Sequence, residues 1–279
     1  MRQQPFGKGG PQVSVIGQGT WYLDHGDRKR AVAALQRGIE AGMTHIDTAE
    51  MYGEAELVIA DAIEGKRDGL FLVSKVLPSN ASRRGTITAC ERSLKRLKTD
   101  RLDCYLLHWR GSYPLADTVA AFEELVAAGK IRSWGVSNFD TDDLDELLSV
   151  SGKGRIACNQ VLYHLRERAI EHAVMPWCEK HGVAVVAYSP FGHDDFPSPG
   201  SKGGEVLAAI ADSHNATPRQ VALSFLARAP VVFPIPKASS AEHAAENAAA
   251  GELTLSAGEI SAIDKAFPRG PKPRSLPML

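Results

Sequence analysis

The chain alternates short apolar runs rich in β-branched residues with longer segments in which apolar residues recur at helical spacing. The short runs predict strands at residues 13–20, 45–47, 70–75, 102–108, 131–137, 156–162, 184–189 and 231–236. The longer segments predict helices at 28–41, 54–64, 83–97, 115–128, 142–150, 169–181, 205–214 and 218–229, with another beginning near Ser240. This alternation is typical of a parallel sheet covered by helices.

Eight strand and helix units in about 250 residues match an α/β fold of the (β/α)8 TIM-barrel type. Two small domains are possible on length alone, but no linker, repeat or low-complexity tract divides the chain, so we expect one domain over residues 1–279. An open doubly wound sheet is the alternative. Such sheets usually carry G-x-G-x-x-G after the first strand, and the run Gly17–Trp21 reads G-Q-G-T-W, without that spacing.

Composition excludes several classes of partner. The chain has 32 basic and 33 acidic side chains, so no net charge favours binding to nucleic acid or an anionic membrane. The first residues lack an apolar run of signal-peptide length, and no later stretch approaches the roughly 18 apolar residues of a membrane span, so we expect a cytoplasmic protein. The 4 cysteines form no C-x-x-C pair, and we expect neither a disulfide framework nor a metal site.

In such barrels the catalytic residues lie at the carboxyl ends of strands and in the loops that follow. The second predicted strand ends at Asp47, with Tyr52 in the next loop, the third ends at Lys75, and the fourth ends at His108. Each residue alone has a structural explanation, such as helix capping, a snorkelling lysine or a core histidine. Their joint occurrence at neighbouring positions on one rim predicts a catalytic set.

These four side chains suit one kind of proton transfer. A phenol with an ordinary pKa near 10 donates poorly unless a cation stabilises its phenolate, and Lys75 is the cation expected beside Tyr52. Asp47 would keep Lys75 charged, while His108 would hydrogen-bond a carbonyl oxygen as negative charge develops on it. A carbonyl protonated while its carbon receives hydride becomes an alcohol, so a nicotinamide cofactor is required.

Several motifs carry a family resemblance: H-I-D-T-A-E-M-Y-G at 45–53, S-K at 74–75, L-L-H-W at 106–109, G-V-S-N-F at 135–139 and I-P-K-A-S-S at 235–240. Through them the chain resembles the aldo-keto reductase superfamily, in its bacterial form, from about residue 17 to 247. The resemblance implies reduction of aldehydes or ketones to alcohols, with Tyr52 as general acid, NADP(H) as cofactor and NAD(H) as a second candidate cofactor.

The resemblance also implies a cofactor site. Ser137, Asn138 and Gln160 match the residues that hold the nicotinamide carboxamide, and Tyr188 matches the ring that stacks on it. The pyrophosphate loop corresponds to Ser189, Pro190 and Gly192, with Phe191 where the family often has leucine. The remaining positions expected to contact the cofactor are Gly19, Thr20, Asp47, Lys237, Ser239, Ser240, His243, Glu246 and Asn247.

The adenosine end departs from the family pattern, because His243 stands where an arginine usually grips the 2′-phosphate and Ala238 replaces a serine. The phosphate could still meet Lys237, Ser239 and Ser240 near a helix N-terminus, which favours NADPH. An imidazole cannot reproduce a permanently charged, bidentate guanidinium. We therefore expect weaker discrimination against NADH.

Trp21, Tyr22 and Trp109 match apolar wall positions of the substrate pocket, which predicts a small-molecule carbonyl substrate with a hydrophobic or aromatic body. The short tail after Asn247 predicts an open, permissive site. We expect a monomer or weak oligomer. Two other function classes are weighed. One is a nicotinamide-binding sensor or regulatory subunit, against which the intact catalytic set argues. The other is an unrelated barrel hydrolase or lyase, which would need clustered metal ligands or a glycine-rich phosphate loop.

Overall fold

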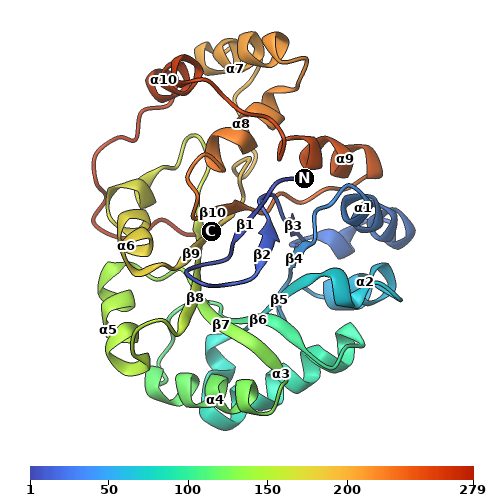
Figure 1. Cartoon of the computed structure of the whole chain (residues 1–279), viewed down its shortest axis with the longest axis vertical. Coiled ribbons are helices and arrows are strands. Elements are labelled where there is room, and N and C mark those ends of the chain that lie inside the picture. The colour runs from blue at the N-terminus through green and yellow to red at the C-terminus, as the bar shows by residue number, and fades with distance from the viewer.

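The computed structural model describes residues 1–279 and contains an eight-stranded sheet in which each strand is parallel to its sequence neighbour (Figure 1). The strands are β3 (Gln18–Gly19), β4 (His45–Asp47), β5 (Phe71–Val76), β6 (Leu102–Leu107), β7 (Ile131–Ser137), β8 (Ile156–Leu162), β9 (Ala184–Tyr188) and β10 (Val232–Pro234). The predicted strands from residue 45 onward agree with these bounds within two residues.

The sheet curls until its two edge strands meet. The amide of Gly17 donates to the Pro234 carbonyl at 2.9 Å, and the amide of Gly19 donates to the Pro236 carbonyl at 3.1 Å. A Cβ atom at residue 19 would lie 2.5 Å from the carbonyl oxygen of Ile235, so only glycine allows this approach. The predicted (β/α)8 barrel is confirmed, and the open-sheet alternative is wrong.

Helices surround the barrel, as Figure 1 shows. They are α1 (Arg28–Glu40), α2 (Ala55–Ala62), α3 (Arg83–Leu97), α4 (Leu115–Ala127), α5 (Thr141–Ser151), α6 (Val174–His181), α7 (Lys202–Ser213), α8 (Pro218–Leu226), α9 (Ala241–Ala249) and α10 (Ala257–Ala266). Single 3-10 turns are η1 (Leu23–His25), η2 (Arg67–Gly69), η3 (Pro78–Asn80) and η4 (Ala169–His172). Helices α7 and α10 pack together outside the ring, and α7 also packs on α8.

Two predicted elements need correction. Residues 13–20 do not form one strand, because β2 (Gln12–Ser14) pairs antiparallel with β1 (Gln3–Pro5) and only Gln18–Gly19 joins the barrel. The predicted helix 169–181 breaks at Ala173, whose φ of −147° is not helical, into η4 and α6. The apolar positions continue through the break, so periodicity alone did not mark it.

The β1–β2 hairpin lies in front of the barrel in Figure 1 and closes its amino-terminal end. The ring of Phe6, just after β1, lies 4.6 Å from that of Phe71 and 5.0 Å from that of Phe233, the residues that begin β5 and occupy the middle of β10. His45 is also fully buried among these rings. The apolar plug leaves the opposite end of the barrel for polar chemistry.

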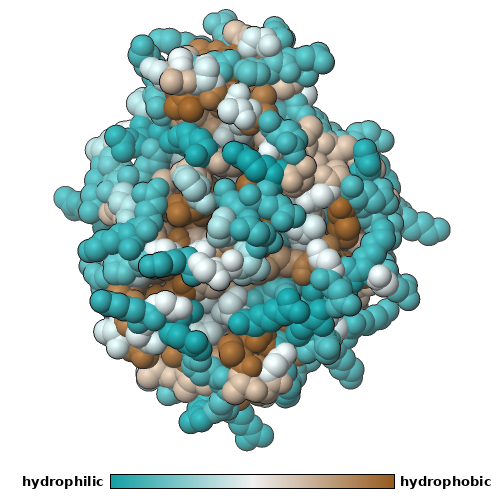
Figure 2. Space-filling model, in the orientation of Figure 1, coloured by the Kyte–Doolittle hydropathy of each residue, from teal (hydrophilic) through white to brown (hydrophobic).

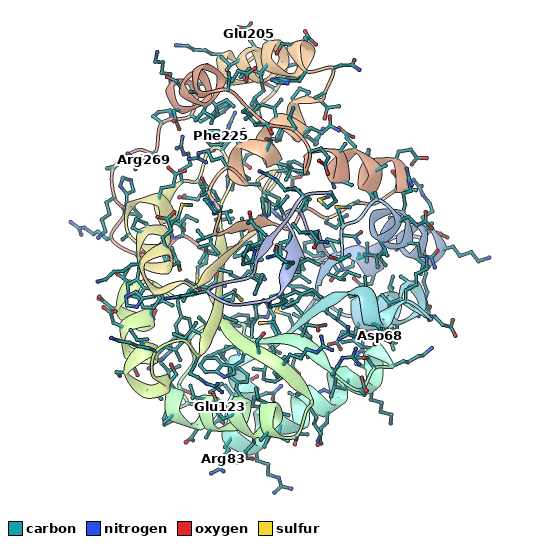
Figure 3. The ribbon with its side chains drawn as sticks, viewed as in Figure 1. Asp68, Arg83, Glu123, Glu205, Phe225 and Arg269 are labelled. Atoms are coloured by element: carbon teal, nitrogen blue, oxygen red, sulfur yellow. The ribbon has the colours of Figure 1, made fainter.

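The main core lies between the sheet and the helices. Trp134 on β7 stacks on Phe122 of α4 at 5.4 Å, and both are almost fully buried. Phe225 of α8 is fully buried, and Figure 3 shows it where α8 faces α7 and α10, with Arg83 at the opposite edge of the molecule. Burial of such large apolar side chains is the main source of stability of the barrel.

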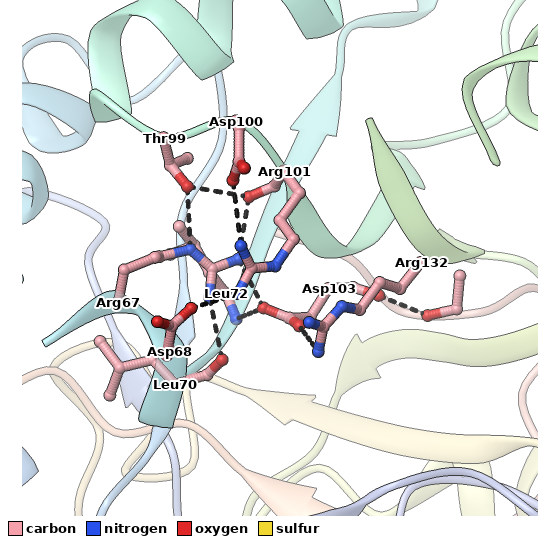
Figure 4. Close-up of polar contacts among 10 residues, drawn as sticks. Arg67, Asp68, Leu70, Leu72, Thr99, Asp100, Arg101, Asp103 and Arg132 are labelled. Atoms are coloured by element: carbon pink, nitrogen blue, oxygen red, sulfur yellow. Dashed lines mark hydrogen bonds and ion pairs between the residues drawn. The ribbon is translucent and has the colours of Figure 1, made fainter. Parts of the chain in front are cut away.

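A polar network braces the amino-terminal ends of the neighbouring strands β5 and β6 (Figure 4). The buried carboxylate of Asp103 accepts from Arg67 at 2.7 Å and from the Leu72 amide at 3.0 Å, and it pairs with Arg132 of β7 at 3.1 Å. Arg67 also donates to the Arg101 carbonyl at 2.8 Å. The buried carboxylate is thereby fully satisfied, so we assign this cluster a structural role.

The face shown in Figure 2 is mostly hydrophilic, with separate hydrophobic patches between the polar side chains. None of the helices combines the length and the apolar character that a bilayer span requires.

Candidate active site

The structure brings Asp47, Tyr52, Lys75 and His108 together at the carboxyl end of the barrel. Asp47 is the last residue of β4, Lys75 lies near the end of β5, and His108 directly follows β6. Tyr52 comes from the loop between β4 and α2. Neighbouring parallel strands end at the same rim, which is why residues far apart in sequence converge here.

The loop that carries Tyr52 is held in one conformation. Gly53 has a φ of +49°, and a Cβ atom there would lie 2.1 Å from a carboxylate oxygen of Asp24. That carboxylate instead accepts from the amide of Glu54 at 2.9 Å. Glu50 reaches the following loop, where its carboxylate accepts from the Leu77 amide at 2.7 Å. These bonds position the phenol before any ligand binds.

The four side chains form one connected group. Lys75 Nζ donates to Asp47 Oδ1 at 2.5 Å and to the Thr48 carbonyl at 2.7 Å, and it lies 4.9 Å from the centre of the Tyr52 ring. The Tyr52 hydroxyl lies 3.5 Å from His108 Nε2. Lys75 is fully buried behind the phenol, so its charge acts on Tyr52 rather than on solvent.

The electrostatics keep each group in a defined protonation state. Burial alone would lower the pKa of Lys75, but the Asp47 carboxylate and the Tyr52 phenol raise it, so the lysine stays a cation. Burial raises the pKa of Tyr52, and Lys75 opposes this rise only in part. Burial, with help from Lys75, lowers the pKa of His108 to about 2. The site therefore presents a protonated phenol and a neutral imidazole at neutral pH.

The prediction that Lys75 makes Tyr52 more acidic than an ordinary phenol needs correction. Lys75 does lower the pKa of Tyr52, but desolvation of the half-buried phenol is the larger effect and has the opposite sign. The net result is a phenol that holds its proton until a reacting group takes it.

A cavity of about 430 Å³ opens over this group. Most residues predicted from the sequence line it: Gly19, Thr20, Trp21, Tyr22, Asp47, Tyr52, His108, Trp109, Ser137, Asn138, Gln160, Tyr188, Ser189, Pro190, Gly192 and Lys237. Sequence reasoning missed Met51, Ile235, Met278 and Leu279, and noted Phe191 only as a departure from the family.

The amide and hydroxyl side chains along one wall are mutually bonded. Gln160 Nε2 donates to Asp47 Oδ2 at 2.7 Å, and its side-chain oxygen Oε1 accepts no hydrogen bond within the chain, while the residue lines the cavity. Ser137 Oγ donates to the main-chain carbonyl of Gln160 at 2.9 Å. Tyr188 donates to Asn138 Oδ1 at 2.9 Å, and Asn138 has a left-handed backbone with φ of 61°. The strained asparagine is thus fixed by the ring beside it.

A second hollow continues from this cavity through Phe191, Gly192 and Lys237, which line both. The predicted residues Ser239, His243, Glu246 and Asn247 line it, together with Asp194, Phe196 and Arg219, which sequence reasoning missed. Ser240 lines neither space, because its hydroxyl accepts from the His243 amide at 3.3 Å and caps α9. The sequence could have indicated Arg219, because the helices of a (β/α)8 barrel begin at the catalytic end and Arg219 lies in the first turn of α8.

The mouth of the cavity is aromatic. Trp21 stacks on Tyr22 at 4.5 Å and lies 6.4 Å from the Tyr52 ring, so it stands beside the phenol. The expected open site needs correction, because the tail returns to the cavity and the Leu279 amide donates to the Tyr188 hydroxyl at 3.3 Å. The tail is short, but its last residues are directed back over the rim.

Comparison with known proteins identifies the family of this chain. The Aldo/keto reductase family model matches residues 15–267. The methylglyoxal reductase YeaE of Escherichia coli (strain K12) is 48% identical over 264 residues, with 93% of each chain covered. The glyoxal reductase of Bacillus subtilis (strain 168) is 34% identical over 96% of this chain and 95% of its own.

Among solved structures, an aldo/keto reductase from Klebsiella pneumoniae in complex with NADP and acetate superposes with a TM-score of 0.93 at 43% identity, with 100% of both chains covered. A second structure from that organism, in complex with NADPH, gives the same TM-score at 44% identity. The chain belongs to the aldo/keto reductase family.

Proposed function

We propose that this chain reduces aldehydes and ketones to alcohols with NADPH, with Tyr52 as the general acid. One observation carries the proposal: a buried lysine paired with a carboxylate stands behind a phenol whose hydroxyl faces a neutral imidazole in a single cavity. The relatives named for methylglyoxal and glyoxal reduction support carbonyl chemistry, and the solved relatives with NADP and NADPH support the cofactor.

The residues of the cavity fit a nicotinamide dinucleotide. Tyr188 lines the cavity and offers an aromatic ring on which a nicotinamide ring can stack. The side-chain oxygen of Gln160 can accept a hydrogen bond from the nicotinamide carboxamide. The loop from Ser189 to Gly192 has positive φ at both ends, 48° and 79°, which turns it around the cavity wall. When bound, the cofactor supplies the hydride that side chains cannot.

The chain's own residues handle the proton. Tyr52 Oη donates its proton to the carbonyl oxygen of the substrate as that oxygen gains negative charge, and a phenolate remains. Lys75 stabilises this phenolate, and Asp47 keeps Lys75 charged and in place. His108 is neutral and carries one N–H; we assign it to Nε2, the ring nitrogen 3.5 Å from the Tyr52 hydroxyl, where it can donate to the substrate oxygen. Solvent then returns a proton to Tyr52.

The substrates that suit the remaining space are small. The cavity of about 430 Å³ must hold both the nicotinamide end of the cofactor and the carbonyl compound. Trp21, Trp109 and the returning tail restrict its mouth. We therefore propose short aldehydes, including 2-oxoaldehydes such as methylglyoxal, as the preferred class, with an apolar or aromatic group tolerated at the mouth.

NADPH oxidation followed by absorbance over a panel of aldehydes, ketones and dicarbonyls tests this proposal, with Tyr52→Phe as the control for a contaminating reductase. We expect turnover with short aldehydes and 2-oxoaldehydes, and its loss in the variant. Tight NADPH binding without turnover on any carbonyl would instead favour the cofactor-sensing class of function.

A further inference from the structure

The hollow beside the main cavity contains an arginine that the family pattern does not account for. Arg219 lies at the start of α8, and its guanidinium lines the hollow with Lys237 and His243. Under the proposed function, this hollow receives the adenosine end of the cofactor, because it joins the cavity through Phe191, Gly192 and Lys237.

The charge on Arg219 does not stabilise the helix that carries it. It is the second residue of α8, after Pro218, and a cation in the first turn is electrostatically unfavourable because the helix N-terminus is itself positive. Its side chain has no carboxylate partner and no hydrogen bond. Its neighbours are instead two aromatic rings, Phe196 at 4.9 Å and Phe191 at 5.7 Å.

These rings hold the guanidinium ready for a ligand. Phe191 and Phe196 pack edge to face at 5.7 Å with an interplanar angle of 89°. A guanidinium over aromatic faces keeps its N–H groups free at its edges, where they can bind a phosphate with two parallel hydrogen bonds. Phe191, which replaces the family's usual leucine, therefore supports Arg219 directly.

Another side chain in the hollow also lacks a partner. Asn247 is only 4% exposed and lines the hollow, yet its amide group makes no hydrogen bond within the chain. The Asn247 amide is therefore free to form a hydrogen bond with a ligand in the hollow. Lys237 adds a second cation that has no ion-pair partner.

Two carboxylates in the same hollow bear on the choice between NADPH and NADH. Glu246 accepts from the Thr217 hydroxyl at 2.6 Å, and Asp194 lies on the loop between Phe191 and Phe196. Carboxylates favour the 2′-hydroxyl of NADH and repel a 2′-phosphate. A strong, fixed cation is needed to reverse that preference, and the exposed imidazole of His243 cannot supply it.

We propose that Arg219 binds the 2′-phosphate of NADP(H) and takes the place of the arginine that His243 replaces. This inference rests on the proposed function, since it requires that the chain bind the cofactor in this orientation. It reverses the expectation of weak discrimination drawn from His243 alone: the chain prefers NADPH because the guanidinium comes from α8 instead of α9.

Isothermal titration with adenosine 2′,5′-bisphosphate and with 5′-AMP tests the assignment without turnover. Arg219→Gln should weaken binding of the bisphosphate by about ten- to a hundredfold, as expected for loss of a charge-assisted bidentate contact, and leave 5′-AMP within about twofold. Arg219→Lys should show an intermediate loss of affinity, since lysine keeps the positive charge but cannot form the two parallel hydrogen bonds of a guanidinium. His243→Gln should change the bisphosphate by less than about threefold.

Arg84→Gln is the matched control, because Arg84 is also an exposed second residue of a helix, α3, far along the chain from the hollow. It should bind both nucleotides like the wild type. Unchanged bisphosphate binding in folded Arg219→Gln, or a loss of binding confined to His243→Gln, would overturn the role of Arg219. The proposed function would still stand in that case if the wild type binds NADPH. If the wild type binds neither NADPH nor the bisphosphate, the proposed function itself fails.

Discussion

Replacement of Lys75 by methionine isolates the charge behind the phenol. The lysine nitrogen lies 4.9 Å from the centre of the Tyr52 ring; Lys75 is fully buried and Tyr52 is half-buried. At about 5 Å and an effective dielectric constant of about 20, a cation stabilises a phenolate by about 3 kcal/mol. That energy corresponds to roughly a 200-fold decrease in kcat, because the phenolate forms only as the proton leaves.

The same change leaves Asp47 buried without its cation, which costs about 3–5 kcal/mol of stability in typical buried pairs. The double variant Asp47→Asn with Lys75→Met removes both charges, so it should recover much of the lost Tm without recovering kcat. Rates are measured on folded protein at saturating NADPH. A kcat of Lys75→Met within about tenfold of wild type, with unchanged cofactor affinity, would refute the electrostatic role of Lys75.

Three further predictions concern stability and metals. Burial lowers the pKa of His45 to about 3, so below pH 6.5 the unfolded chain binds a proton at this residue that the folded chain does not. The free energy of unfolding, measured by urea titration, should therefore fall between about pH 6 and 4. It should fall by less in His45→Leu. A pH dependence identical in the two proteins would contradict this. Gly19→Ala should cost about 1–3 kcal/mol, because the new Cβ meets the Ile235 carbonyl, whereas Gly200→Ala, with nothing within 4 Å, should change stability by less than about 0.5 kcal/mol in the same thermal unfolding assay. Incubation with a chelator should leave kcat unchanged, because no group of three or more potential ligand side chains gathers in the chain; loss of activity restored by added metal would show otherwise.

The barrel was predictable because its strands are short, buried and separated by helices of clear period. The strand ends then located Asp47, Lys75 and His108 without any knowledge of side-chain contacts. The hairpin of β1 and β2 was not predictable in the same way. Gln3, Gln4 and Pro5 carry no apolar alternation, and they form a strand only because the neighbouring Phe6 fills the end of the barrel.

The adenosine end shows what reading by position leaves out. The family pattern led to His243, since it assigns a role to a fixed place after the last strand. Arg219 lies 24 residues earlier and reaches the same hollow from another helix. Arg219 reaches this hollow only because α8 packs beside the loop that carries Phe191 and Phe196. The returning tail at Leu279 was missed for the same reason.

Single-turnover measurement of NADPH oxidation by stopped flow, in the wild type and in Tyr52→Phe with a 2-oxoaldehyde, tests the central claim most directly. The variant keeps the ring beside His108 and loses only the hydroxyl group that donates the proton. The account predicts a decrease of about a hundred- to ten-thousandfold in the rate of the oxidation step, with NADPH affinity within about twofold of wild type. A rate within about tenfold of wild type would contradict the assignment of Tyr52 as the proton donor.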